Sequence, residues 1–300
     1  MNKNLKGSLI LLLTAIIWGS SFVSQKVGIE TVGPMTFIGL RTLLGSIVLL
    51  PVILVSDKAK AKENVMPFSN ITLLKGGLYC GIFLCIASTL QTFGMKYIDA
   101  GKSGFLTSLY MIFVPIIGIF MGKKLNAKTV IAVFMALIGM YLLCMKNGFS
   151  SVNIGDILVL LCAVFFSFHI MVIDKFSPKV DGIKLSCLQF FVAGAVASIG
   201  MLIFEKPSLN DIIMSSMPIA YSGIMSCGVA YTLQIIGQKY ADPVLATIIM
   251  SLESVFAALS GWLFLNEMMT SREFFGCLIV FMAVIYIQLP SLKIKKIINN

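Results

Sequence analysis

The sequence predicts an all-α membrane protein with ten transmembrane helices arranged as two inverted five-helix repeats. Three observations lead to this prediction: the composition, the length and number of the apolar stretches, and a similarity between the two halves of the chain. Of the 300 residues, 58% are hydrophobic and 12% are charged, whereas a water-soluble globule needs far more charge to cover its surface. The composition therefore suits lipid as the surrounding solvent.

Ten apolar stretches follow one another, separated by short polar connections. Each is long enough to cross a bilayer core of about 30 Å, which takes about 20 residues of α-helix. A β-barrel would instead show segments of about 10 residues with alternating polarity. The predicted spans are residues 7–27, 34–55, 71–94, 100–121, 126–145, 153–173, 183–204, 212–236, 242–264 and 270–288.

The first stretch follows Lys3 and Lys6 and has the basic start and apolar run of a signal peptide. A small-x-small cleavage site is absent from its end, where Trp18 stands instead. We therefore expect this segment to stay in the protein as the first helix.

Seven cysteines fall inside the predicted spans without a C-x-x-C pair. In such positions cysteine behaves as a small apolar packing residue. The sequence therefore predicts neither a disulfide framework nor a metal site, and we expect no cofactor.

The net charge of +10 is explained by topology rather than by nucleic acid. With the N-terminus in the cytoplasm, sixteen of the 23 Lys and Arg residues fall on the cytoplasmic side, six fall on the other side, and Arg41 lies within the second span. Basic residues prefer cytoplasmic connections. We therefore expect a multi-pass protein of the cytoplasmic membrane with both termini in the cytoplasm and no nucleic-acid partner.

The two halves of the chain resemble each other. Seven residues recur 143 positions later with the same spacing, so that Thr89, Leu90, Gln91, Gly94, Lys96, Tyr97 and Asp99 correspond to Thr232, Leu233, Gln234, Gly237, Lys239, Tyr240 and Asp242. The first two helices of each half correspond at an offset of 148, which pairs Gly7 with Gly155 and Arg41 with Gln189. Five helices are an odd number, so the second half enters the membrane from the opposite side. We expect repeats over 7–145 and 153–288, followed by a short basic cytoplasmic tail over 289–300.

Several short motifs resemble a known family in their order and spacing. They are Trp18-Gly19-Ser20-Ser21-Phe22, Arg41, Pro115 with Gly118, and Ser251-Leu252-Glu253 followed by Gly261 and Glu267. Together they resemble the ten-helix EamA-type members of the drug/metabolite transporter superfamily over nearly the whole chain. Ser254 stands where that pattern usually has proline, and Asn266 where it usually has glycine. The resemblance implies transport of a small molecule, and the family's cargoes are too varied to name one.

Four residues are expected to bind the substrate near the membrane midplane. Glu253 lies about 11 residues into its span, some 16 Å deep at about 1.5 Å per residue, and its repeat mate Tyr110 lies at a similar depth. Trp18 and its counterpart Phe166 fall at about the same level. Ionisable groups in hydrocarbon are costly and mark functional sites, and a carboxylate among aromatic rings suits an amine-bearing or aromatic solute such as an amino acid. A structural carboxylate and ordinary aromatic packing are the alternatives.

Four further polar residues are candidates for gating or coupling. Arg41 could pair with Glu253, snorkel outward or be structural. His169 could relay protons or be a hydrogen-bonded packing residue. Gln91 and Gln234 fall near opposite membrane faces, where they could line gates or join helices by hydrogen bonds. Protons are therefore a candidate coupling ion. Asp99, Asp242 and Glu267 come at helix ends, where cap contacts are expected.

Inverted repeats of this kind build secondary transporters, in which two halves expose a central site to each side in turn. We therefore expect a secondary transporter that exports a small metabolite or drug-like solute. The alternatives are a channel, a membrane receptor or scaffold, and an intramembrane enzyme. Gly101-Lys102-Ser103-Gly104 matches the G-x-S-G of intramembrane serine proteases, but Ser103 lies about 5 Å below one surface and His169 about 24 Å below it. A hydrogen bond between nucleophile and base is then out of reach.

Overall fold

The computed structural model describes residues 3–62, 69–98, 100–122, 124–144, 153–264 and 269–289. Within these ranges the regular elements are helices. In chain order they are α1 (Lys3–Thr31), α2 (Pro34–Lys62), α3 (Asn70–Gly94), α4 (Ala100–Ser108), α5 (Tyr110–Phe120), α6 (Ala127–Cys144), α7 (Ile154–Phe176), η1 (Ser177–Lys179), α8 (Gly182–Phe204), α9 (Leu209–Met214), α10 (Ser216–Tyr221), η2 (Ser222–Tyr231), α11 (Thr232–Gln238), α12 (Pro243–Met250), α13 (Glu253–Phe264) and α14 (Ser271–Gln288).

The helices account for the ten predicted spans, which confirms the predicted fold class. By length and composition, nine helical segments in the described part of the chain could cross a membrane, and the tenth, Ala127–Leu143, is apolar but shorter. Several ends differ by up to four residues, as at α1, which begins at Lys3 and ends at Thr31, and two differences have a clear structural cause. Helix α2 continues to Lys62, beyond the predicted end at residue 55, because alanine and lysine favour helix outside the hydrocarbon as well. The predicted start at residue 212 falls within α9, a separate short helix before the crossing.

The fourth and ninth spans are each interrupted at equivalent positions. Between α4 and α5 the chain tightens, and the Leu109 amide donates to the Leu106 carbonyl three residues back. At the equivalent point between α12 and α13, Leu252 donates to Ile249 in the same way. Such a tightening within a helix often marks a hinge. Tyr110 and Glu253 are therefore the first residues of the second helical segments in their spans.

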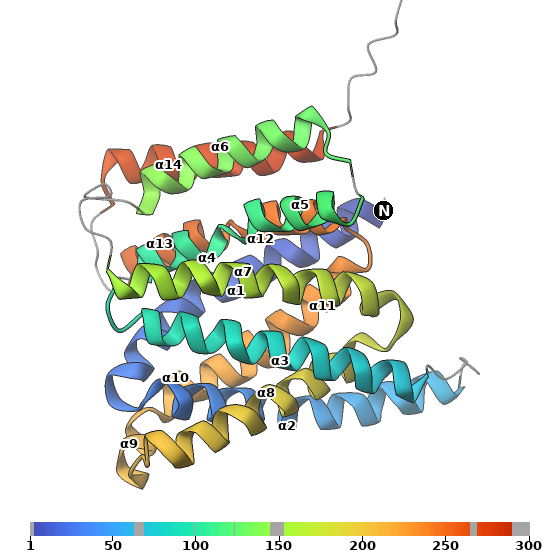
Figure 1. The fold of residues 1–300 in the computed structure, drawn as a ribbon, viewed down its shortest axis with the longest axis vertical. Coiled ribbons are helices and arrows are strands. Elements are labelled where there is room, and N and C mark those ends of the chain that lie inside the picture. Colours follow the sequence, from blue (N-terminus) through green and yellow to red (C-terminus); the bar gives the residue numbers. More distant parts are fainter. Residues whose placement is uncertain are drawn as a thin grey trace, which may run out of the picture.

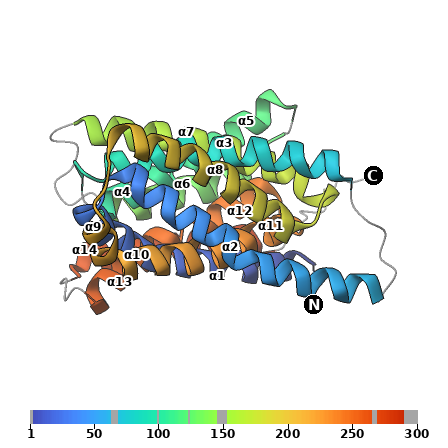
Figure 2. The ribbon, with the colours of Figure 1, turned by 90° about the horizontal axis from the view of Figure 1, so that it is seen from below.

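The helices lie side by side as a layered bundle. Figure 1 shows α6 and α14 together along one edge and α2 with α8 along the opposite edge, with the remaining long helices between them. Figure 2 shows the same helices from the α2 and α8 side, running in roughly one direction. At the α6–α14 edge, a Cβ on Gly139 would lie 2.8 Å from the Gly276 carbonyl oxygen, and a Cβ on Gly276 would lie 2.6 Å from the Gly139 oxygen. Only glycine allows two helices to approach so closely.

Reciprocal contacts between α2 and α8 show that the two halves are inverted. At the end of α8, Glu205 accepts hydrogen bonds from the amides of Met35 (2.8 Å) and Thr36 (2.7 Å) at the start of α2. At the other end of the pair, Asp57 of α2 forms an ion pair of 2.9 Å with Lys184 at the start of α8. Glu205 is 148 positions after Asp57, and Lys184 is 148 positions after Thr36. Each contact is therefore the repeat copy of the other, seen from the opposite face.

The helices begin and end at two opposite faces of the bundle, which we call the Thr31 face and the Phe176 face. The Thr31 face carries the end of α1 and the start of α7, and the Phe176 face carries the start of α1 and the end of α7. Asp242 caps α12 by accepting a hydrogen bond from the Val244 amide (2.9 Å), as expected for a residue at a helix end. Asp99, Glu267 and residues 290–300 of the predicted tail lie outside the described residues.

Candidate functional site

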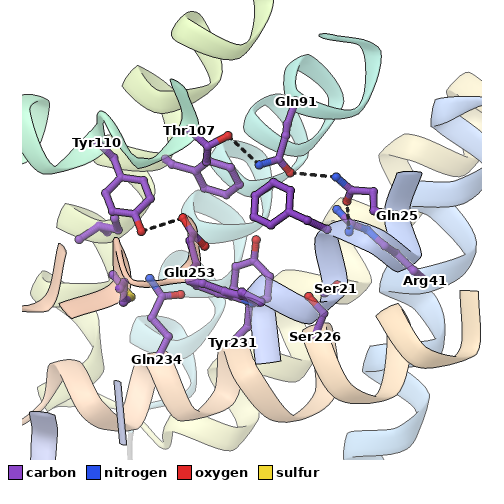
Figure 3. Close-up of a pocket in the computed structure, with 15 residues that line it drawn as sticks. Ser21, Gln25, Arg41, Gln91, Thr107, Tyr110, Ser226, Tyr231, Gln234 and Glu253 are labelled. Atoms are coloured by element: carbon purple, nitrogen blue, oxygen red, sulfur yellow. Dashed lines mark hydrogen bonds between the residues drawn. The ribbon is translucent and has the colours of Figure 1, made fainter. Parts of the chain in front are cut away.

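A central cavity lies between the two halves. It measures about 520 Å³ when the space that opens out of it is counted. Side chains from both repeats line it, and Figure 3 shows them converging from opposite sides. The lining residues are Trp18, Ser21, Phe22, Gln25, Arg41, Gln91, Thr107, Tyr110, Phe166, Ile170, Ser226, Tyr231, Gln234, Met250 and Glu253.

Glu253 is held at the cavity by the interruption in its span. As the first residue of α13 it is 3% exposed, and its Oε1 accepts hydrogen bonds from the Tyr110 hydroxyl (2.9 Å) and the Ser108 hydroxyl (3.2 Å). Figure 3 shows the Tyr110 bond across the cavity. Both donors converge on Oε1, and Oε2 has no hydrogen bond within the described chain. A carboxylate has about four acceptor sites, so Glu253 has capacity for a ligand.

Ser254 occupies the position at which the family pattern usually has proline. Its hydroxyl lies 3.0 Å from that of Ser108 and donates to the Ser251 carbonyl (3.1 Å). The serine therefore adds a contact to the group that holds Glu253.

Aromatic rings surround the middle of the cavity. The rings of Trp18 and Tyr231 meet edge to face with centroids 4.6 Å apart, and Phe22 and Phe166 complete the wall. The indole Nε1 of Trp18 has no hydrogen-bond acceptor in the described part of the protein. Aromatic faces attract cations that approach within about 6 Å. The wall thus suits a solute that combines an apolar body with a positively charged group.

A chain of hydrogen bonds crosses the end of the cavity nearer the Thr31 face. We call Arg41, Gln25, Gln91 and Thr107 the polar chain. Arg41 Nη1 donates to Gln25 Oε1 (2.5 Å), Gln25 Nε2 to Gln91 Oε1 (3.3 Å), and Gln91 Nε2 to Thr107 Oγ1 (3.0 Å). Figure 3 shows this chain. It joins α2, α1, α3 and α4, so separating these helices at this end requires breaking buried hydrogen bonds.

The structure brings seven of the eight predicted site residues to this one cavity. The four expected substrate-binding residues all line it, and so do three of the gating candidates, Arg41, Gln91 and Gln234. The exception is His169, which is fully buried behind Tyr231 with ring centroids 6.0 Å apart and has its Nε2 2.9 Å from Gln189 Oε1. This is the packing arrangement that the sequence left open.

Arg41 does not pair with Glu253. Its hydrogen-bond partner is the neutral side chain of Gln25, and its guanidinium lies over the ring of Phe37 at 5.4 Å. No ion pair joins Arg41 to Glu253 in the described chain. The two residues are at comparable depth by sequence, but side-chain packing directs them to different ends of the cavity.

Sequence reasoning missed several lining residues whose spacing would have indicated them. Ser21, Phe22 and Gln25 follow Trp18 by three, four and seven positions, and Tyr231 precedes Gln234 by three. Residues at these spacings share one face of a helix. Extending each expected site residue along its own helix face would have found most of the lining.

A second cavity lies on the same helices, nearer the Phe176 face. It is lined by parts of α5, α7 and α12 that are adjacent to the central lining, for example Val114, Met171 and Val244. Val114 is one turn beyond Tyr110, and Met171 follows Ile170 directly. The two cavities are therefore separated by about one helical turn of side chains.

The structure does not bring together Ser103 and His169, the pair that the alternative of an intramembrane enzyme requires. Ser103 Oγ has no hydrogen-bond partner in the described chain, and His169 bonds to Gln189 instead. The described residues also contain no cluster of three or more His, Cys, Asp or Glu side chains able to hold a metal ion.

An all-helical membrane protein with two related halves around a partly polar cavity has an architecture that is found among transporters. Comparison with known proteins gives the family: the EamA-like transporter family model matches residues 5–145 and 153–289. This chain belongs to the EamA-like transporter family.

Named relatives agree with this assignment. The chain is 31% identical to an "Uncharacterized transporter" of Archaeoglobus fulgidus over 96% of this chain and 87% of that protein. It is 25% identical to the "Probable amino-acid metabolite efflux pump" of Escherichia coli, over 98% of each. A solved crystal structure shares the fold with a TM-score of 0.75 at 18% identity, covering 94% of this chain and 96% of the other.

Proposed function

We propose that this protein is a secondary transporter that exports a small amine-bearing solute with an apolar or aromatic body by alternating access. The observation that carries the proposal is Oε2 of Glu253, which has no hydrogen bond within the described residues and belongs to a side chain that lines an aromatic-walled cavity between two inverted repeats. A buried carboxylate with an open acceptor suits an ammonium group, and the rings of Trp18 and Phe166 suit the body of such a solute.

Alternating access is supported by the positions of the interruptions and cavities. Tyr110 and Glu253 stand where the fourth and ninth spans are interrupted, so movement of either half-helix would change the surroundings of the site. The polar chain bounds the cavity toward the Thr31 face. On the other side, about one helical turn separates it from the second cavity. Movement of α5 and α12 against α7 would join the two cavities while the polar chain stays intact.

The Phe176 face is assigned to the cytoplasm, and the membrane to the cytoplasmic membrane, from the distribution of basic residues. The test is labelling of single cysteines with an impermeant reagent in intact cells. A cysteine in place of Asn210, which is exposed in α9 at the Thr31 face, should be labelled. One in place of Lys58, near the end of α2, should be labelled only after the cells are opened. The opposite pattern would reverse the assignment.

The transport proposal is tested first by ligand-induced stabilisation of the purified protein. A solute that binds only the folded state raises the apparent melting temperature, so amino acids, amines, quaternary cations and sugars are compared at equal concentration. Amine-bearing compounds should stabilise the protein, and sugars should not. The name of the Escherichia coli relative, an amino-acid metabolite efflux pump, makes amino acids the first class to assay and export the first direction.

Flux in proteoliposomes then separates the classes of function. A carrier shows saturation and counterflow, a channel shows neither, and a receptor or scaffold binds without flux. Hydrolysis of a lipid or peptide would support the enzyme instead. Proton coupling is tested in the same vesicles by imposing a pH gradient.

A further inference from the structure

Arg41 is a second charged residue at the central cavity, and the polar chain leaves most of its hydrogen-bonding capacity unused. It is 4% exposed, and only Nη1, bonded to Gln25, has a partner in the described chain, while Nε has none. A guanidinium carries five N–H donors and binds a carboxylate with two of them side by side. Burying such a cation against a neutral amide and the ring of Phe37, without an anionic partner, is costly, which favours an anionic ligand group at this point.

The opposite charge lies at the other end of the same cavity. Glu253 has an unused carboxylate oxygen and no cationic partner within the described residues. The two charges therefore face the same cavity without forming an ion pair with each other. A ligand with a single charge would satisfy only one of them.

Helix α1 runs past both Glu253 and Arg41, so positions along α1 give the relative depths of the two residues. A Cβ on Gly19 would lie 2.8 Å from the Glu253 carbonyl oxygen, so Gly19 is level with Glu253. Gln25, which binds Arg41, lies six residues further along α1, about 9 Å at 1.5 Å per residue. Glu253 and Arg41 therefore meet the cavity at different depths, so one ligand can contact both only through two groups of opposite charge at different points of its structure.

We propose that the cavity recognises a dipolar solute, with its ammonium group at Glu253, its carboxylate at Arg41 and its body among the rings of Trp18, Phe22 and Tyr231. This inference rests on the proposed function and narrows it, because a solute with an amine alone leaves Arg41 unpaired. It also gives Arg41 the role of selecting solutes that carry an acidic group.

Three probes that share a phenyl ring and a two-carbon chain test the proposal on the purified full-length protein. Phenylalanine carries both charged groups, phenethylamine lacks the carboxylate, and 3-phenylpropanoate lacks the amine. Binding is measured by calorimetry and by thermal stabilisation. The wild-type protein should bind phenylalanine at least about tenfold more tightly than either of the others, because each analogue leaves one buried charge unpaired.

Substitutions at Arg41 and Glu253 test which residue binds the carboxylate and which binds the ammonium group of the solute. Arg41→Gln should reduce phenylalanine affinity to within about twofold of phenethylamine affinity and leave phenethylamine binding unchanged, and Arg41→Lys should retain part of the preference. Glu253→Gln should weaken the binding of both amine-bearing probes, phenylalanine and phenethylamine. Arg272→Gln is the matched control, since Arg272 lies over the ring of Tyr141 at the start of α14, outside the cavity lining.

The outcomes separate this inference from the proposed function. If phenethylamine binds as tightly as phenylalanine to the wild-type protein, or if Arg41→Gln leaves the preference intact, the dipolar proposal is overturned while amine transport stands. If none of the amine-bearing probes binds or moves, both proposals fail. Should Arg41→Gln not fold, the comparison of the three probes on the wild-type protein and on Arg41→Lys still decides.

Discussion

The two halves of the bundle bound the central cavity with equivalent helices but different chemistry. Toward the Thr31 face the polar chain forms three consecutive hydrogen bonds. Through the repeat, Gln25, Arg41, Gln91 and Thr107 correspond to Ile173, Gln189, Gln234 and Met250. Gln189 bonds to His169, and Oε1 of Gln234 has no partner in the described chain. Ile173 and Met250 are apolar, so the equivalent positions of the second half form no continuous chain of hydrogen bonds.

This difference indicates that the symmetry of the backbone does not extend to the side chains. Apolar contacts slide and separate gradually, whereas a buried hydrogen-bonded chain breaks at a defined cost. The Thr31 end of the cavity is therefore held by a continuous chain of hydrogen bonds that the equivalent positions of the second half do not form. We expect substitutions at equivalent positions to have unequal effects, and four predictions follow from that expectation in order of size.

The largest effect is expected at Gln25. The substitution Gln25→Ile makes the first half resemble the second and removes the one hydrogen-bond partner of Arg41 in the described chain. A buried charge left without its partner costs about 3 kcal/mol. Chemical denaturation in detergent should show this loss, and Arg41→Met combined with Gln25→Ile should recover most of it. A Gln25→Ile protein as stable as the wild type would show that the polar chain does not hold this end together.

The next effect compares the reciprocal contacts of α2 and α8. Glu205→Ala removes three hydrogen bonds at the start of α2, from the Met35 amide and from the amide and hydroxyl of Thr36, and should cost about 2 kcal/mol. Asp57→Ala removes the equivalent exposed ion pair with Lys184 and should cost less than about 1 kcal/mol. Unfolding curves of the two variants measure the contrast. Equal losses would contradict it.

A smaller free-energy change, on binding rather than stability, is expected at Glu253. Its repeat mate Tyr110 cannot carry a negative charge to an ammonium group as a carboxylate does. Glu253→Gln should therefore weaken binding of an amine probe by more than tenfold, about 1.4 kcal/mol, while Tyr110→Phe should weaken it less. If protons are coupled, Glu253→Gln should retain counterflow exchange but lose the response of flux to a pH gradient. Unchanged affinity, flux and pH response together would make Glu253 structural.

The smallest effect separates two glutamines at equivalent positions. Gln91→Leu removes bonds to Gln25 and Thr107, and hydrogen bonds between membrane helices average about 0.6 kcal/mol each, so a loss of about 1 kcal/mol is expected. Gln234→Leu removes an amide whose oxygen has no partner in the described chain, and stability should change little or rise slightly. Thermal melts of both variants, run side by side, provide the measurement. A larger loss at Gln234 would reverse the comparison.

Most of the fold could be predicted because its causes are local. The length and apolarity of each stretch identify the spans, since hydrocarbon requires a closed backbone hydrogen-bond ladder. The interruptions at Leu109 and Leu252 were not foreseen. They carry no proline or glycine at the point of change, and the third-residue hydrogen bonds that define them exist only in the folded chain. The expected end of α2 was wrong because the helix continues past the hydrocarbon to Lys62 without a composition signal. The expected start of the eighth span was wrong because Leu209–Met214 forms a separate short helix before the crossing.

The sequence by itself determined that this chain is a membrane protein, that its halves are inverted copies, and which polar residues are functional candidates because burying them in the membrane is costly. Those conclusions rest on composition, spacing and depth along single helices. The tertiary structure alone decided that His169 lies behind the cavity rather than in it, and that Arg41 bonds to Gln25 instead of Glu253. The physical reason is rotation: depth follows from residue count, but the direction in which a side chain points depends on how each helix turns against its neighbours. Hydrogen-bond partners 16 to 145 positions apart are therefore fixed only when the helices pack.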